Sequence, residues 1–156
     1  MLQWTEQFAT GVGHIDHQHQ ALIDNINQLE MLLVNFSPNK QEYQFMLQLV
    51  DFLEFYAKSH FNVEEQCMEA FRCPVHAKNK QAHATFLAFF EEFKTQYQLN
   101  GLRREFIETL HAMVSGWIME HILQVDTQLK ICIKGGIAPQ NPTVSTSQLT
   151  PPASNV

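Results

Sequence analysis

The feature that most constrains this 156-residue chain is the spacing of its apolar residues. In four long segments, at about 17–36, 40–70, 75–98 and 102–133, they recur every three or four positions, which places them on one face of an α-helix. Four amphipathic helices joined by short connections predict an all-α, up-down-up-down four-helix bundle. The clearest stripe, that of the second segment, reads Met46, Val50, Leu53, Ala57, His60, Glu64, Cys67 and Phe71.

Short breaks separate the four segments. Asp16 can cap the first helix, and Ser37-Pro38-Asn39 can end it because proline suits a helix start and not an interior. Cys73-Pro74 is expected to start the third helix, and Asn100-Gly101 is a typical helix stop. The fourth helix is expected to run without interruption to Gly135-Gly136.

The two ends of the chain have different expected structures. Residues 1–15 form an irregular arm anchored by Trp4 and Phe8, with Gln18 as a brace. The last residues are rich in Pro, Ser and Thr and lack a helical stripe. We therefore expect a bundle domain at 1–134 and a flexible tail at 135–156.

Composition excludes several classes of protein. The net charge of −6 and the absence of a Lys/Arg run argue against nucleic-acid binding. No apolar run reaches the ~18 residues of a membrane span, and the first residues do not resemble a signal peptide. Three cysteines in no thiolate metal motif predict reduced thiols in a cytoplasmic protein. The alternative is an intermolecular disulfide through Cys73 or Cys132.

Several residues that are costly to bury lie on or beside these apolar stripes. His60 and Glu64 are four apart, so they share one helix face, whereas His121 and Asp126 are five apart and diverge by roughly 140° on a regular helix. Imidazole and carboxylate together suit iron, manganese or zinc. The pattern predicts a metal centre in the bundle interior, with six candidate ligands: His19, His60, Glu64, His83, His121 and Asp126.

The order of these motifs resembles that of bacterial single-domain hemerythrins. The resemblance covers residues 4 to about 130. It rests on Trp4, the run from Gly11 to His19, His60-Phe61-Asn62-Val63-Glu64, His83-Ala84-Thr85-Phe86, and Trp117 to His121 followed by Asp126.

The resemblance implies a non-haem diiron centre with an oxo or hydroxo bridge that binds dioxygen for carriage, storage or delivery. His19 and His60 would bind one iron, His83 and His121 the other, and the carboxylates of Glu64 and Asp126 would bridge them. It implies an oxygen-binding protein and not an enzyme, and we expect a monomer, with room for an unidentified protein partner. The implied oxygen pocket consists of Leu22, Phe61, Phe86, Trp117, Ile118 and Ile122.

One position departs from the family pattern. The family has a histidine four residues before His83, where this chain has Asn79. His76 cannot replace it, because seven residues span roughly 10 Å along a helix. Asn79 could be a weak ligand, could hold a water on the metal, or could be a polar core residue. The alternative functions are a diiron peroxidase, a nitric oxide-handling enzyme, or a metal-buffering or purely structural bundle.

Overall fold

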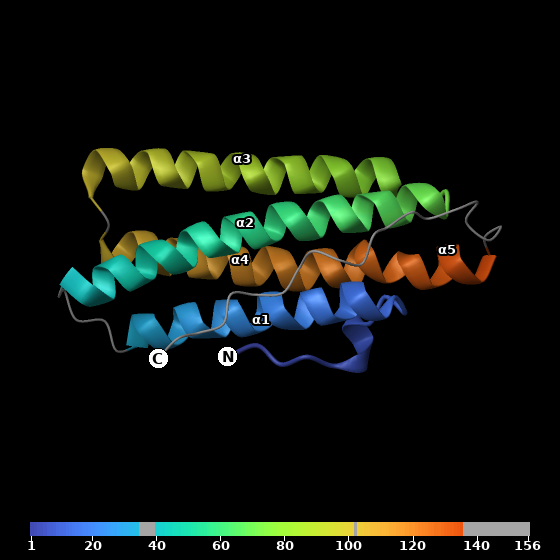
Figure 1. Ribbon diagram of the computed structural model, residues 1–156, viewed down its shortest axis with the longest axis horizontal. Helices are drawn as coiled ribbons and strands as arrows, with labels where there is room; N and C mark the ends of the chain where they lie inside the picture. Colours follow the sequence, from blue (N-terminus) through green and yellow to red (C-terminus); the bar gives the residue numbers. More distant parts are fainter. Residues whose placement is uncertain (35–39, 102, 136–156) are drawn as a thin grey trace.

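The protein is a four-helix bundle, as the sequence predicts (Figure 1). The computed structural model describes residues 1–34, 40–101 and 103–135, and within these ranges it contains helices and no strand. The long helices are α1 (Gly13–Val34), α2 (Lys40–Ala70), α3 (His76–Asn100) and α4 (Arg104–Gln124). Three short helices complete the fold: η1 (Glu6–Phe8), η2 (Asp126–Gln128) and α5 (Leu129–Gly135).

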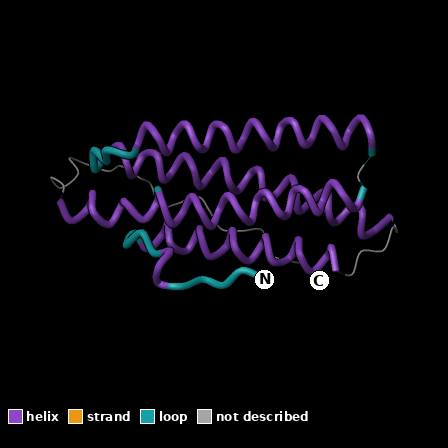
Figure 2. Tube along the Cα trace, turned by 180° about the vertical axis from the view of Figure 1, so that it is seen from behind, coloured by secondary structure: helices purple, strands orange, loops and turns teal. Residues whose placement is uncertain are grey.

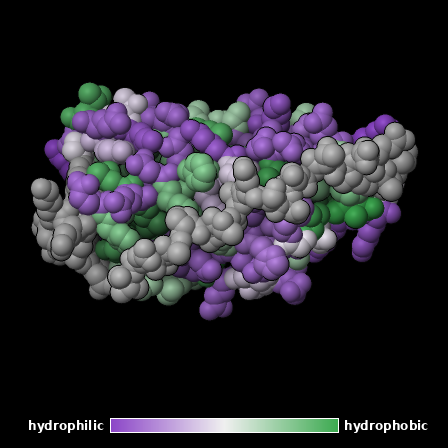
Figure 3. All heavy atoms as spheres, in the orientation of Figure 1, coloured by the Kyte–Doolittle hydropathy of each residue, from purple (hydrophilic) through white to green (hydrophobic). Residues whose placement is uncertain are grey.

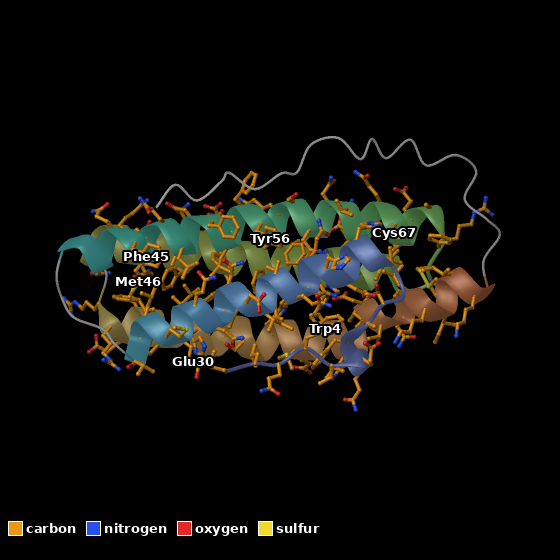
Figure 4. The ribbon with its side chains drawn as sticks, turned by 60° about the horizontal axis from the view of Figure 1, so that its bottom comes forward. Trp4, Glu30, Phe45, Met46, Tyr56 and Cys67 are labelled. Carbon is orange, nitrogen blue, oxygen red and sulfur yellow. A yellow bond between two sulfur atoms is a disulfide. The ribbon has the colours of Figure 1, made fainter. Side chains whose placement is uncertain are left out.

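The four long helices run side by side, and α5 continues the direction of α4 (Figures 1 and 2). α1 packs against α2 and α4, and α2 packs against α3. The apolar stripes face inward and form a core that includes Ile26, Val50, Leu53, Phe90 and Leu110. The face seen in Figure 3 is mostly hydrophilic, as expected for amphipathic helices. On α2, Met46 is buried, whereas its neighbour Phe45 is half exposed (Figure 4).

The helix ends agree with the sequence in part. Gly101 ends α3 with a φ of 74°, a backbone conformation that glycine adopts without steric cost. The prediction that Asp16 caps α1 is wrong, because α1 already begins at Gly13. Asp16 instead accepts hydrogen bonds from the backbone N–H and the hydroxyl of Thr10, at 2.6 and 2.7 Å, and so fastens the preceding arm to the first turn.

The connections also differ from the prediction. Cys73-Pro74 does not start α3: these residues lie in the turn after α2, and α3 begins at His76. In this turn, Arg72 has a positive φ of 51°. The predicted break at Ser37-Pro38-Asn39 and the predicted tail, apart from Gly135, lie outside the described residues.

The predicted continuous fourth helix is wrong. α4 ends at Gln124, and the next residue, Val125, has φ −116° and ψ −59° and donates its backbone N–H to the carbonyl of His121. The chain then forms η2 and restarts as α5. This interruption changes the direction in which Asp126 projects.

The predicted N-terminal arm is present, although it contains the short helix η1 and ends where α1 begins at Gly13, and it lies along α1. Leu2 exchanges two backbone hydrogen bonds with the side chain of Asn27, at 2.7 and 2.9 Å. Trp4 packs against Phe8 and against His19, with ring centroids 5.9 and 6.4 Å apart (Figure 4). The arm therefore covers one of the candidate ligands.

The prediction of three reduced thiols is wrong for two of the cysteines. Cys73 and Cys132 form an intramolecular disulfide, with Cα atoms 5.3 Å apart, that joins the α2–α3 turn to α5. Both cysteines belong to a small apolar cluster with Ile15, Met68 and Leu129 at this end of the bundle. Cys67 is a free, partly buried thiol.

We predict that this disulfide is a major contribution to stability. It joins residues 59 positions apart, a loop for which the loss of chain entropy in the unfolded state gives about 4 kcal/mol. The Cys73→Ser/Cys132→Ser variant should lose free energy of unfolding of that order in urea denaturation. Reductant should destabilise the parent and leave this double variant unchanged. Cys67→Ser is the matched control, and equal stability of the parent and the double variant would contradict the prediction.

Candidate metal centre

The structure brings all six predicted ligand residues together inside the bundle. All are buried, with between 0 and 7% of each residue exposed. Every long helix contributes at least one of them, and η2 contributes the last: His19 from α1, His60 and Glu64 from α2, His83 from α3, His121 from α4 and Asp126 from η2.

One group of candidate ligand atoms belongs to His19, His60 and Glu64, whose atoms lie within 4.8 Å of one another. His19 Nε2 is 3.8 Å from Glu64 Oε1, and His60 Nε2 is 4.0 Å from Glu64 Oε2. Asp126 Oδ2 lies 3.5 Å from His19 Nε2, so a second carboxylate borders the group. Two imidazoles and two carboxylates therefore surround this position.

A second group consists of Glu64, His83, His121 and Asp126. His83 Nε2 is 3.4 Å from Glu64 Oε2, and His121 Nε2 is 3.2 Å from Asp126 Oδ1. The two imidazole nitrogens are 3.1 Å apart. Atoms that bind a common ion at about 2 Å have mutual distances of this size. Glu64 belongs to both groups, and Asp126 reaches a histidine of each, which is the arrangement that bridging carboxylates need.

The position of Asp126 depends on the break after α4. On a regular helix, His121 and Asp126 would diverge by roughly 140°. Because the chain leaves the α-helix at Val125, the Asp126 carboxylate instead reaches both His121 and His19.

The buried histidines favour the neutral form, in which an imidazole nitrogen can bind a metal. The pKa of His19 and of His60 is lowered from 6.5 to about 3, mainly by burial and in part by the other histidines of the cluster, while the Glu64 carboxylate acts in the opposite direction on His60. Burial also lowers the pKa of His121 to about 3, together with its neighbour His83. Three of the four candidate histidines therefore present lone pairs and not charges at neutral pH.

The two carboxyl groups respond in opposite directions. Burial and the nearby Glu64 carboxylate raise the pKa of Asp126 well above its usual value. Burial opposes ionisation of Glu64 too, but its contacts with His83, His60 and Asn79 outweigh this effect and lower its pKa. One proton on the pair thus reduces the repulsion between two buried anions, and cations between them would have the same effect.

Several polar atoms at the centre lack a hydrogen-bond partner. These are both ring nitrogens of His19, Oε1 of Glu64 and Oδ1 of Asp126. Buried polar atoms are normally satisfied, because desolvation without a partner is costly. Unpaired imidazole nitrogens and carboxylate oxygens that face one another form a donor set that fits divalent or trivalent iron.

Asn79 lies inside this donor set and is fully buried. Its amide oxygen lies 2.7 Å from His121 Nε2, within hydrogen-bond distance. Its amide nitrogen donates to Glu64 Oε2 and to the Met68 sulfur, both at 3.2 Å. The structure thus places Asn79 at the second group, where its one potential ligand atom, the amide oxygen, is a weaker donor than imidazole.

Two further residues contact the outer nitrogens of the candidate ligands. Gln18 Oε1 lies 3.1 Å from His60 Nδ1, and Glu65 Oε1 lies 2.9 Å from His83 Nδ1. Such contacts fix the ring orientation and point Nε2 toward the metal position. The sequence interpretation gave Gln18 only a role as a brace and omitted Glu65, although each adjoins a candidate ligand in the sequence.

Three of the residues expected to surround bound oxygen pack against the imidazoles of the second group or against one another. Phe61 stacks on His83, with ring centroids 3.8 Å apart, and Trp117 stacks on His121 at 4.2 Å. Phe86 packs against Trp117 at 4.2 Å. The remaining three, Leu22, Ile118 and Ile122, are buried in the same apolar cluster. An apolar wall therefore borders the polar centre, which limits access of water.

We predict that the apoprotein loses stability as the pH falls from about 6.5 toward 3. Because burial holds the pKa of His19, His60 and His121 near 3, the unfolded chain binds protons in this interval that the folded chain does not. The raised pKa of Asp126 acts in the opposite direction, but only one group contributes it. Urea midpoints of the metal-free protein measured from pH 7.5 to 4.5 test this, and His19→Gln should reduce the slope. A midpoint independent of pH would contradict it.

Comparisons with known proteins agree with this geometry. Residues 10–130 match the family model of the hemerythrin HHE cation binding domain. The chain is 26% identical over 122 residues to a bacteriohemerythrin of Stenotrophomonas maltophilia strain R551-3, an alignment that covers 78% of this chain and 74% of the relative. It is 27% identical over 129 residues to a bacteriohemerythrin of Clostridium acetobutylicum, covering 82% of this chain and 98% of the relative.

Solved structures support the fold. A wild-type hemerythrin crystal structure aligns with a TM-score of 0.72 at 23% identity, covering 85% of this chain and 98% of the other. A hemerythrin point variant aligns at 0.71 and 24% identity, covering 85% and 97%. Because the family model covers most of the chain and the buried donors converge, the chain belongs to the hemerythrin family of diiron, oxygen-binding proteins.

Proposed function

We propose that this protein carries, stores or delivers dioxygen at a non-haem diiron centre. The observation that supports the proposal most directly is the convergence of four buried histidines and two buried carboxylates on two overlapping positions, where four of their polar atoms lack a hydrogen-bond partner. In this assignment, His19 and His60 hold one iron, and His83 and His121 hold the other. Glu64 and Asp126 would be shared by the two ions, and an oxo or hydroxo group would complete the centre.

The pair of irons supplies the electrons that reversible oxygen binding requires. The protein residues provide the setting for this chemistry. The stacked pairs Phe61–His83 and Trp117–His121 hold the two imidazoles in orientation and exclude water from one side. Leu22, Ile118 and Ile122 belong to the same buried apolar core as Phe61 and Phe86, and apolar surroundings favour a small apolar ligand such as dioxygen.

Asn79 is the feature that bears most directly on the finer function. It leaves the second position with two histidines, the same number as the first. Peroxide reduction or nitric oxide chemistry requires an additional exchangeable position on the metal, and a weakly bound amide would supply one. These activities are the outcome we would expect if oxygen binding were not reversible.

Other aspects of the function remain predictions. Within the described residues, no helix has the length and apolarity needed to cross a bilayer. The predicted cytoplasmic location depends on reduced thiols, and the disulfide between Cys73 and Cys132 removes that support. The monomeric state, the lack of nucleic-acid binding, the limits of the bundle domain and the role of the tail rest on the sequence alone. An unidentified protein partner is compatible with delivery of oxygen.

We predict that the reduced protein contains two irons per chain and gains a visible band on addition of oxygen that disappears on its removal. The test is to reduce the protein anaerobically, quantify its iron and record the spectrum before and after oxygen. Asn79→His should bind the second iron more tightly because it adds an imidazole. Irreversible oxidation of the parent would contradict the carrier function and direct the work to peroxide and nitric oxide assays.

We predict that His60→Ala or Glu64→Ala abolishes loading of iron while helix content stays largely intact. Each variant removes a donor from the buried centre, whereas the apolar core of the bundle is unchanged. Iron stoichiometry and far-ultraviolet circular dichroism measure the two effects. Asn62→Ala is the matched control, because Asn62 lies between these residues on the exposed side of α2 and should retain both irons. Full iron retention by both ligand variants would exclude the assignment.

A further inference from the structure

The two candidate metal positions differ in the hydrogen bonds behind their histidines. At the first position, the outer nitrogen of His60 contacts the neutral amide of Gln18 at 3.1 Å, and His19 Nδ1 has no hydrogen-bond partner. At the second position, the outer nitrogen of His83 contacts the carboxylate of Glu65 at 2.9 Å. Of these contacts, only that of His83 involves a charged group.

The Glu65 contact is built into the site and is not a loose surface contact. Glu65 follows Glu64 on α2, and its side chain is 22% exposed, while that of His83 is 1% exposed. With Nδ1 donating to a carboxylate, His83 Nε2 carries the lone pair, and this atom lies 3.4 Å from Glu64 Oε2. A hydrogen-bonded anion also makes an imidazole a stronger donor to a metal.

The same position is the one at which Asn79 replaces an imidazole. Asn79 Oδ1 lies 2.7 Å from His121 Nε2, so His121 and Asn79 contact each other directly. The weaker ligand, Asn79, and the hydrogen bond from His83 to the Glu65 carboxylate thus lie at the same metal position. Both would affect the ion that His83 binds.

We propose that Glu65 is a positioning residue that strengthens His83 as a ligand and thereby offsets the loss of an imidazole at Asn79. The inference rests on the proposed diiron centre and assigns a role to a residue outside the ligand set. In this proposal a carboxylate stands behind a histidine at the second position, whereas at the first position the group behind His60 is the neutral amide of Gln18.

Titration of the metal-free protein with Co²⁺ alone tests the proposal, since its visible bands report both stoichiometry and ligand geometry. The parent should bind two ions. Glu65→Gln, which keeps the size of the side chain and removes the charge, should weaken one of the two sites by about 10- to 100-fold. Glu65→Asp retains the charge and should recover part of the loss. Glu69→Gln, an exposed glutamate one turn further along α2, is the matched control and should behave like the parent.

A second readout separates positioning from a merely structural role. A stronger imidazole donor favours ferric over ferrous iron, so Glu65→Gln should raise the reduction potential of the iron-loaded protein. Its metal-free form should keep the helix content of the parent. Gln18→Glu, which places a charge behind His60, should lower the potential.

The outcomes distinguish this inference from the proposed function. Two Co²⁺ ions in the parent and weakened binding at one site in Glu65→Gln, with rescue by Glu65→Asp, support it. Two ions bound with equal affinity in the parent and Glu65→Gln overturn it and leave the diiron proposal intact. Failure of the parent itself to bind two ions overturns both.

Discussion

The dominant constraint on this structure is the burial of polar and ionisable side chains inside an apolar helical core, which is costly unless those groups are paired or bind a metal. Four imidazoles, two carboxyls and an amide are buried at its centre, and burial holds three of the imidazoles in the neutral form. An apolar core of the same size would be free of these desolvation costs. Under the proposed assignment, metal binding offsets the costs, so the free energy of binding contributes directly to folding. The buried donors are then a reason for the fold to depend on its cofactor.

The end of the bundle that contains η2, α5 and the α2–α3 turn holds the Asp126 carboxylate in place. Asp126 comes from a three-residue helix that has little stability of its own. It is held on one side by the end of α4 and on the other by α5, whose Leu129 and Cys132 pack with Ile15 and Met68. The disulfide to Cys73 fixes α5 against the α2–α3 turn. The small apolar cluster and the disulfide thus keep the Asp126 carboxylate near His19 and His121. A continuous helix would have pointed this side chain away from His121.

The periodicity of the apolar residues could predict most of the fold, because each apolar stripe indicates one helix and the face of that helix that is buried. It could also predict the six candidate ligands, since charged and imidazole groups on a stripe such as His60 and Glu64 must be buried. The interruption at Val125 could not be predicted, because no proline or glycine marks it and the weak helix propensity of Val125, Asp126 and Thr127 does not by itself end a helix. The pairing of Cys73 with Cys132 depends on how distant segments meet. Glu65 lies off the apolar stripe, so its contact with His83 required knowledge of the distance between α2 and α3.

The replacement of a histidine by Asn79 shows that the residues hydrogen-bonded to the ligands distinguish the two metal positions better than the ligands themselves do. Counted as ligands, the two positions are alike, with two histidines each and two shared carboxylates. They differ in what lies behind and beside those histidines: a neutral amide behind His60, a carboxylate behind His83, and an amide oxygen against His121. Under the proposed assignment, the asymmetry that the family places in the number of histidines is here transferred to hydrogen bonds. Hydrogen-bonded groups behind a ligand alter its donor strength without occupying a position on the metal. A chain of this kind can therefore differ from its relatives in affinity and redox behaviour while it keeps the same fold and the same bridging carboxylates.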